Sequence, residues 1–170
     1  MNATALLSFP VGVLVERHKA TSPWLDYVWR PVSILSGLPV AAPWTLLSSD
    51  AGRQTFYAGT ASIELYRTET ANYLSNLASG APSLWVVLRP TEADPPYEVV
   101  AVTADPAEGE AFAEAGNDLI EAVPMPANIV AAIEAFIAEH HVERPTFKRQ
   151  RDRQGWSGPE RRGGGGEDQR

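Results

Sequence analysis

Apolar residues recur at every second position near the start of the chain, and this period of two constrains the fold more than any other feature. Leu7, Phe9, Val11, Val13 and Val15 occupy every second position. Successive side chains of a β-strand point to opposite faces, so the pattern predicts a half-buried first strand. The chain must therefore build a sheet and cover one of its faces.

Several short strands follow, and each is ended by turn residues. Val32 and Ile34 continue a second strand to Ser36-Gly37, and "WTLLSS" and "RQTFYAGT" predict two more, separated by a turn at residues 50–52. The stretch "SIELYRTE" puts Ile63 and Leu65 on one face. Further on, "LWVVL" (residues 84–88) is typical of a strand covered on both faces, with "YEVVAVT" as its neighbour. Strands joined by turns favour antiparallel pairing.

Three helices are predicted from their end signals. Thr68 caps the first, which Gly80 ends, and Asp105, Pro106 and Glu108 begin the second, which ends at Gly116. The third covers residues 126–141 and has one apolar face. We expect an α+β fold: a single domain with an antiparallel or mixed sheet of about six to seven strands and three helices, the C-terminal helix packed on the sheet.

Charge divides the chain into two parts. Residues 1–143 hold 6 Lys and Arg against 17 Asp and Glu, a formal charge of −11, whereas residues 144–170 hold 8 against 4, a formal charge of +4. We expect a globular α+β domain over residues 1–143 and a basic, glycine-rich flexible tail over 144–170. Such a split predicts that the tail meets something acidic, which is the body of the same molecule, another protein or a polyanion.

Missing residue types and motifs exclude several classes of function. The chain has no cysteine, which excludes disulfides, thiolate metal sites, iron–sulfur sites and a cysteine nucleophile. It lacks a G-x-S-x-G elbow, an H-E-x-x-H helix and a glycine-rich phosphate loop after the first strand. No stretch approaches the roughly 20 apolar residues that span a bilayer. We expect a cytoplasmic protein with no membrane association and no cofactor, and the motifs favour a protein that is not an enzyme.

His140 and His141 are the first candidates for a metal site or a general base. Neighbouring helical residues point about 100° apart, so two adjacent imidazoles do not easily share one metal ion. Cations are favoured at a helix C-terminus by the helix dipole. The pair is therefore predicted to lie at the C-terminus of the helix and interact with its dipole, and both histidines are only weak candidates for metal ligands.

The stretch "SPWLDYVWRP" holds the most informative cluster of side chains, namely Trp24, Asp26, Tyr27, Trp29 and Arg30. One interpretation is structural: the aromatic residues fix a loop to the sheet, Asp26 caps a turn and Arg30 pairs with an acid. The other is recognition, because tryptophan and arginine are enriched in binding hot spots and prolines at both ends preorganise the loop. We expect the roles to divide, with Trp29 buried in the second strand and Trp24 exposed in the loop.

A second candidate binding segment lies in the tail. Its residues are Phe147, Lys148, Arg149, Arg151 and Arg153, followed by Trp156. Basic residues interleaved with aromatic ones can bind nucleic acid through phosphate contacts and stacking. The acidic body would repel a polyanion, so a protein-docking arm or a solvated tail is favoured over nucleic-acid binding.

Two long segments resemble a known family. "PVGVLVERHKATSPWLDYVWRPVSILSG" and "PMPANIVAAIEAFIAEHHVERPTFKRQRDR" are similar to the bacterial domain-of-unknown-function family 3305, over about residues 9 to 153. The resemblance implies a setting: such proteins are encoded beside formate dehydrogenase and its molybdenum-cofactor accessory genes.

Two functions follow from this setting. The first is a non-enzymatic accessory or maturation protein that binds a protein partner, such as a formate dehydrogenase subunit or a maturation factor. The alternative is a nucleotide- or pterin-binding protein or enzyme of molybdenum cofactor metabolism. A molybdopterin-type nucleotide would then stack on Trp24 and Trp29, and Arg30 would contact its anionic group.

Overall fold

The computed structural model describes residues 4–142, and its strands form two antiparallel sheets. The first sheet has the order β2-β1-β4-β3 and the second β6-β5-β7. The strands are β1 (Leu7–Lys19), β2 (Tyr27–Leu35), β3 (Thr45–Asp50), β4 (Arg53–Leu65), β5 (Ser83–Pro90), β6 (Tyr97–Thr103) and β7 (Leu119–Pro124). The helices are a 3-10 turn η1 (Arg67–Glu69), α1 (Thr70–Ala78), α2 (Pro106–Glu114) and α3 (Ala127–His140).

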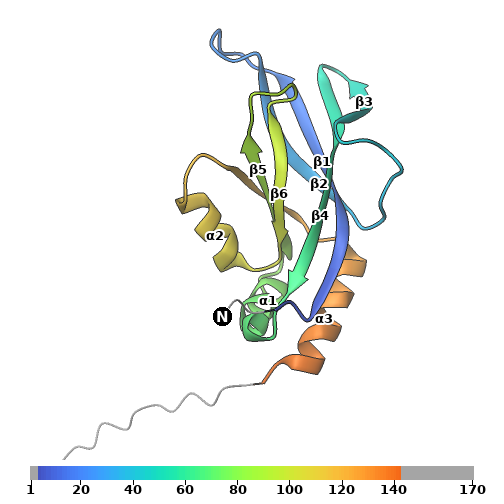
Figure 1. Cartoon of the computed structure of the whole chain (residues 1–170), viewed down its shortest axis with the longest axis vertical. Helices are drawn as coiled ribbons and strands as arrows, with labels where there is room; N and C mark the ends of the chain where they lie inside the picture. Colours follow the sequence, from blue (N-terminus) through green and yellow to red (C-terminus); the bar gives the residue numbers. More distant parts are fainter. Residues whose placement is uncertain (1–3, 143–170) are drawn as a thin grey trace, which may run out of the picture.

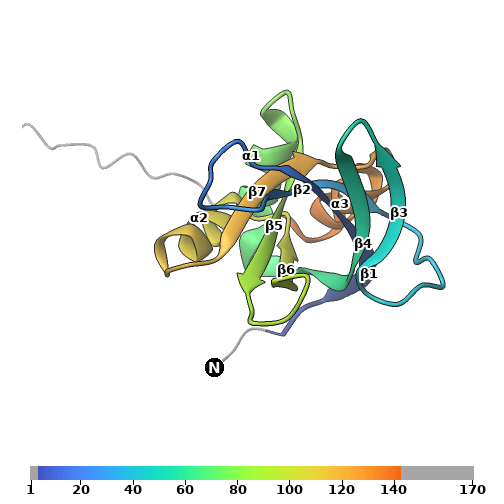
Figure 2. The same cartoon turned by 90° about the horizontal axis from the view of Figure 1, so that it is seen from above.

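The two sheets face each other and enclose the core. β4 lies beside β6, and β2 lies beside β7, although no ladder of hydrogen bonds joins either pair. Seen from above, the strands surround the space that the core fills (Figure 2). Val11, Val13 and Val15 of β1 are completely buried there, as are Ile63 of β4 and Val86 of β5. The predicted first strand is therefore confirmed.

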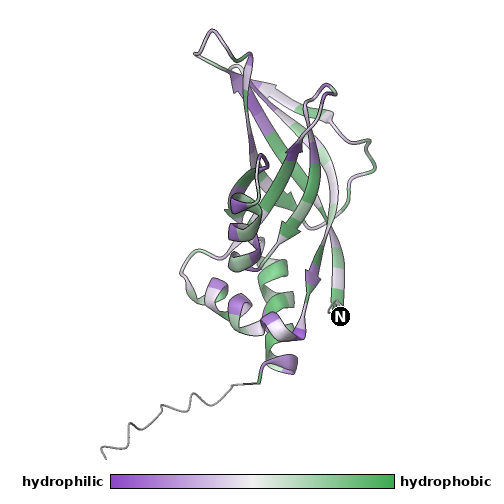
Figure 3. Cartoon of the chain, turned by 60° about the vertical axis from the view of Figure 1, so that its left-hand side comes forward, coloured by the Kyte–Doolittle hydropathy of each residue, from purple (hydrophilic) through white to green (hydrophobic). Residues whose placement is uncertain are grey.

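The α-helices occupy the lower end and one outer face (Figure 1). α3 contacts α1, and its buried residues Ile129, Ile133, Phe136 and Ile137 join the core formed by the strands. Figure 3 shows hydrophobic residues along α3 and the middle of the strands, whereas the strand ends at the top are hydrophilic. The predicted α+β class, its seven strands and its three α-helices are confirmed for residues 4–142, and the strands divide between two sheets.

α2 covers the outer face of the second sheet. The Asp105 side chain caps it by accepting a hydrogen bond from the Ala107 N–H at 2.9 Å, as predicted. Glu108 does not close the expected box, because it accepts from the Thr103 hydroxyl, which in turn accepts from the Asp105 N–H. Val87 is completely buried although it lies outside the inner core, so the prediction that "LWVVL" is covered on both faces is confirmed.

Three local predictions need correction. "SIELYRTE" begins as part of β4 and does not form a separate strand, and residues 119–124 form β7, for which no strand was predicted. Thr68 lies inside η1, and α1 begins at Thr70 with no side-chain cap. α1 ends before Gly80, whose φ of 86° is easy for glycine, as expected.

Candidate functional site

The loop between β1 and β2 is the first candidate site, and it forms the tip of a long hairpin (Figure 1). The Ala20 N–H donates to the Asp26 carbonyl at 3.1 Å and closes the loop. Inside it, the Leu25 N–H donates to the Ser22 carbonyl, and the Trp24 N–H donates to the Ser22 hydroxyl. The loop backbone is thus held by its own hydrogen bonds, and these bonds place Trp24 at the apex.

The two tryptophans of this segment lie in opposite environments. Trp24 is 90% exposed, and its neighbour Leu25 is 61% exposed. Trp29 is only 9% exposed and belongs to the core. The prediction that Trp29 is buried and Trp24 exposed is confirmed. The Trp24 indole is therefore at the surface and contributes little to core packing.

Trp29 is the centre of an aromatic cluster. Its ring centroid lies 5.7 Å from Phe56, 5.8 Å from Trp44, 6.2 Å from Tyr97 and 6.3 Å from Tyr27. The tilted and edge-on geometries are those that aromatic pairs prefer. This cluster closes the core below the β1–β2 loop and fixes the start of β2.

Arg17 lies against this cluster from β1. Its guanidinium carbon is 4.1 Å from the centroid of the Tyr27 ring, and it lies farther from two other rings of the cluster, at 5.1 Å from Phe56 and 5.3 Å from Trp29. The Arg17 Nε donates to Gln54 Oε1 at 2.6 Å. Among residues 4–142, Arg17 has no acidic partner within ion-pair distance. The positive charge of Arg17 is therefore stabilised by cation–π contacts with these aromatic rings at the base of the loop.

Asp26 and Arg30 do not join Trp24 in a pocket. Asp26 is exposed, and its backbone carbonyl, not its side chain, closes the loop. Arg30 is exposed and lies opposite Glu16 in the β1–β2 register, but Glu16 pairs with Arg53 at 3.1 Å. Strand alternation puts Arg30 on the face opposite Trp29.

The hollow beneath the loop also excludes both tryptophans. It has a volume of about 630 Å³ and is lined by residues 19–27 except Trp24. The aromatic partners of Trp29 within residues 4–142 do not include Trp24. Within residues 4–142, Trp24 and Trp29 therefore do not share this hollow and do not stack on each other.

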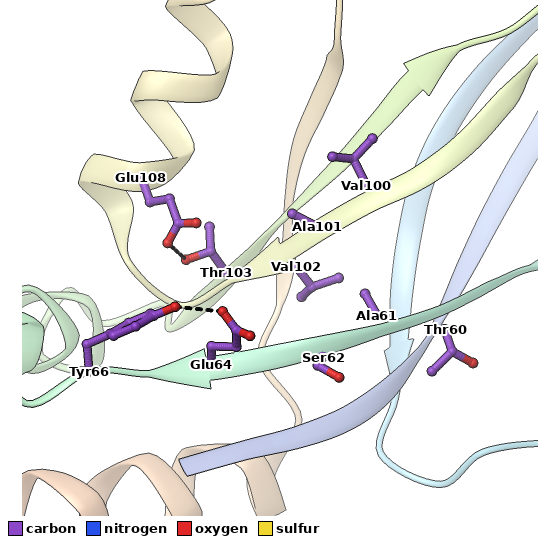
Figure 4. A pocket seen from close by; sticks show the side chains of 10 residues that line it. All are labelled: Thr60, Ala61, Ser62, Glu64, Tyr66, Val100, Ala101, Val102, Thr103 and Glu108. Carbon is purple, nitrogen blue, oxygen red and sulfur yellow. Dashed lines mark hydrogen bonds between the residues drawn. The ribbon is translucent and has the colours of Figure 1, made fainter. Parts of the chain in front are cut away.

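A groove between β4 and β6 is a second candidate that the sequence did not reveal (Figure 4). Its volume is about 270 Å³, and its polar rim includes Glu64, Tyr66, Thr103 and Glu108. The Tyr66 hydroxyl donates to Glu64 Oε2 at 2.6 Å. This hydrogen bond, burial and the negative charges of Glu64 and Glu108 raise the pKa of Tyr66. The groove therefore favours a cation over an anion.

His140 and His141 end α3 and point to different neighbours. The His140 ring packs against Phe136 in a tilted arrangement at a centroid distance of 4.6 Å, and His141 Nδ1 lies 3.0 Å from the Thr70 hydroxyl. His140 is the last helical residue and His141 the C-cap, so the predicted helix end is confirmed. Within residues 4–142, no three His, Cys, Asp or Glu side chains are placed to hold a metal ion.

The tail candidates lie outside the described residues. These are Phe147, Lys148, Arg149, Arg151 and Arg153, and the predicted flexible tail over 144–170 lies there too. The helices of the described part are too short or too polar to cross a membrane.

The comparisons with known proteins give one family. A family model described as "Protein of unknown function (DUF3305)" matches residues 10–151, which is most of the chain. No curated protein and no solved structure matches this chain.

Proposed function

The chain belongs to the DUF3305 family, and on that premise we propose that it is a non-enzymatic accessory or maturation protein that binds a protein partner. The observation that carries this proposal is Trp24, which is 90% exposed at the apex of a loop closed by its own hydrogen bonds. An exposed indole next to an exposed leucine is the kind of apolar surface that a partner buries. Covering one such side chain contributes roughly 1.5 to 3 kcal/mol or more.

Charge around the loop supports a protein partner with an acidic surface. Four of the six Lys and Arg residues of residues 1–143 lie near this end of the first sheet, namely Arg17, Lys19, Arg30 and Arg53, together with the acidic residues Glu16, Asp26 and Asp50. The rest of the body is strongly acidic. The seven residues at this end sum to 4 − 3 = +1, so an acidic partner is repelled less at this end than by the rest of the body.

The partner that we propose is a subunit of a molybdenum-dependent formate dehydrogenase or one of its maturation factors. This step rests on the genomic setting that the family resemblance implies, and the exposed loop supplies the surface. A protein that acts in maturation needs a docking surface and no catalytic group of its own. We propose that it acts in the cytoplasm.

Affinity purification tests the proposal. The full-length chain, expressed with a tag in a host that makes this enzyme, should recover a formate dehydrogenase subunit or maturation factor. Trp24→Ala should lose most of that recovery. Val40→Ala, at an equally exposed position in the β2–β3 loop, is the matched control and should keep it. The proposal fails if the parent recovers neither and deletion of the gene leaves formate dehydrogenase activity intact.

A fluorescence titration addresses the alternative function. The proposed accessory role predicts no change in tryptophan emission when guanine nucleotides are added, because the hollow beneath the loop includes neither Trp24 nor Trp29. Saturable quenching that Trp24→Ala abolishes would instead indicate a nucleotide- or pterin-binding protein.

A further inference from the structure

The groove between β4 and β6 combines two free strand edges. β3 pairs with β4 only as far as Tyr57, so the stretch from Thr60 to Glu64 has β1 on one side and the groove on the other. β6 is the edge strand of the second sheet and borders the same groove. Free edges present backbone donors and acceptors that an extended segment can use. Figure 4 shows the two strands, with Glu64, Tyr66, Thr103 and Glu108 together at one end of the groove.

The rim of the groove is acidic and lacks a counter-charge in the described part. Glu64 and Glu108 come from opposite sides and are both exposed. Each accepts a hydrogen bond from a neutral hydroxyl, Glu64 from Tyr66 and Glu108 from Thr103. Neither carboxylate forms an ion pair with another residue of 4–142. A ligand of this groove should therefore bring positive charge.

The described chain ends against the start of α1, which follows the groove rim in the sequence. His141, one residue before its end, lies 3.0 Å from the Thr70 hydroxyl through Nδ1. Thr70 begins α1, four residues after Tyr66 on the groove rim. The next five residues, 143–147, can span at most about 17 Å. They lead directly to the basic cluster "KRQRDR", residues 148–153.

We propose that residues 148–153 of the same molecule bind in the groove between β4 and β6, with their Lys and Arg side chains paired to Glu64 and Glu108. Three observations carry this assignment: the charge of the groove, the charge of the cluster and the point where the described chain ends. The DUF3305 match runs to Arg151, so the matched unit includes the first part of the cluster. The half of β4 that borders the groove runs toward α1, away from the β1–β2 loop (Figure 1), so the proposal is independent of partner binding by Trp24.

Paramagnetic relaxation enhancement tests the contact in the full-length chain. Because the sequence has no cysteine, Ala107→Cys gives one nitroxide site beside Glu108, at an exposed position that does not line the groove. At low ionic strength, the amide resonances of residues 148–153 should lose most of their intensity. A label at Ser48→Cys, on the exposed strand β3, is the control and should leave them unchanged. The contact should disappear in about 1 M salt, where the Debye length is about 3 Å.

Charge-matched variants identify the groove as the binding site. Glu64→Gln with Glu108→Gln should abolish the intensity loss, whereas Glu114→Gln with Glu134→Gln removes the same charge elsewhere and should preserve it. The proposal is overturned if both labels broaden the cluster equally or if the Glu64/Glu108 variant leaves the broadening unchanged. It is also overturned if broadening appears when labelled, NMR-silent protein is mixed with unlabelled, ¹⁵N-enriched protein, because the contact would then be between molecules.

Discussion

Trp24 and Trp29 lie five residues apart and differ because one belongs to a loop and the other to a strand. Trp29 is on the inner face of β2, where Phe56, Trp44 and Tyr97 surround it. Trp24 lies before the strand begins, and alternation does not direct it inward. The residue type alone therefore does not determine the role, whereas its position relative to the start of the strand does.

Alanine substitutions should separate the two roles. Trp24→Ala should lower the free energy of unfolding by less than about 1 kcal/mol, as surface substitutions do. Trp29→Ala should lower it by roughly 3 to 5 kcal/mol, because it opens a cavity among packed rings. Urea unfolding followed by circular dichroism measures both. A large loss for Trp24→Ala would show that the loop is structural.

Tyr73 should give the protein a distinct dependence on alkaline pH. Burial raises the pKa of Tyr73 to about 12, and its hydroxyl accepts a hydrogen bond from the Tyr66 N–H at 2.9 Å. An unfolded tyrosine titrates near pH 10. The folded state thus favours the protonated phenol, so this contribution to stability is complete below about pH 10 and is lost as pH rises toward 12.

Tyr73→Phe tests this linkage. The variant should be less stable at neutral pH by about 1 to 3 kcal/mol, because the Tyr66 N–H loses its acceptor. Its free energy of unfolding should also fall less steeply than that of the parent between about pH 10 and 12. Denaturant titrations across this range measure the slopes. Parallel curves for parent and variant would exclude Tyr73 as the titrating group.

At the scale of the elements, β4 shows why strand boundaries could be predicted only in part. Its inward residues Phe56 and Ala58 are at even positions, whereas Ile63 and Leu65 are at odd positions. The change of parity in the sequence indicates two strands. In the structure a bulge at Ala58, next to Gly59 with a φ of 140°, absorbs the extra residue and one strand continues.

β7 was missed for another physical reason. β7 has only one buried residue, Val123, so its sequence carries little alternation for a prediction to use. It becomes a strand because β5 offers it a free edge, which is a long-range property. The Asp105 cap of α2 and the Gly80 stop of α1 were predictable because each depends on local backbone chemistry.

Gly109 is the residue that lets α2 approach β5. A Cβ atom at this position would lie 2.7 Å from Cγ of Trp85, which is closer than real contacts allow. Gly109→Ala should therefore destabilise the protein by about 1 to 3 kcal/mol through overpacking, although alanine favours a helix by about 1 kcal/mol over glycine. Thermal unfolding measures the effect.

A double-mutant cycle supplies the control for Gly109. If the clash with Trp85 is the cause, Gly109→Ala should cost much less in a Trp85→Ala background than in the parent. Equal costs in the two backgrounds would contradict this account and point to an effect within α2 itself.

At the scale of the whole molecule, the candidate sites differ in how far the sequence reveals them. The β1–β2 loop was predictable because Trp24 and the prolines on either side of it lie within one ten-residue stretch. The acidic groove was not, because Glu64 and Glu108 are brought together only when the two sheets face each other. The resemblance identified the family but not the groove, which depends on this packing of sheets.

Truncation after Glu143 tests how the acidic body and the basic tail depend on each other. The described core draws its buried residues from six of the seven strands and from α1 and α3, all within residues 4–142. We therefore expect the fragment 1–143 to unfold cooperatively, with the α+β spectrum of the full chain. If the tail binds the groove through exposed ion pairs, its removal should lower the free energy of unfolding by no more than about 1 kcal/mol. That loss should be measurable at low ionic strength and should vanish in about 1 M salt, because exposed charges are then screened. Urea unfolding of both chains at the two salt concentrations measures this difference in the free energy of unfolding.

A fragment 1–143 with no cooperative transition would contradict the domain boundary. It would show that the segment after Glu143 belongs to the core and is not an appendage.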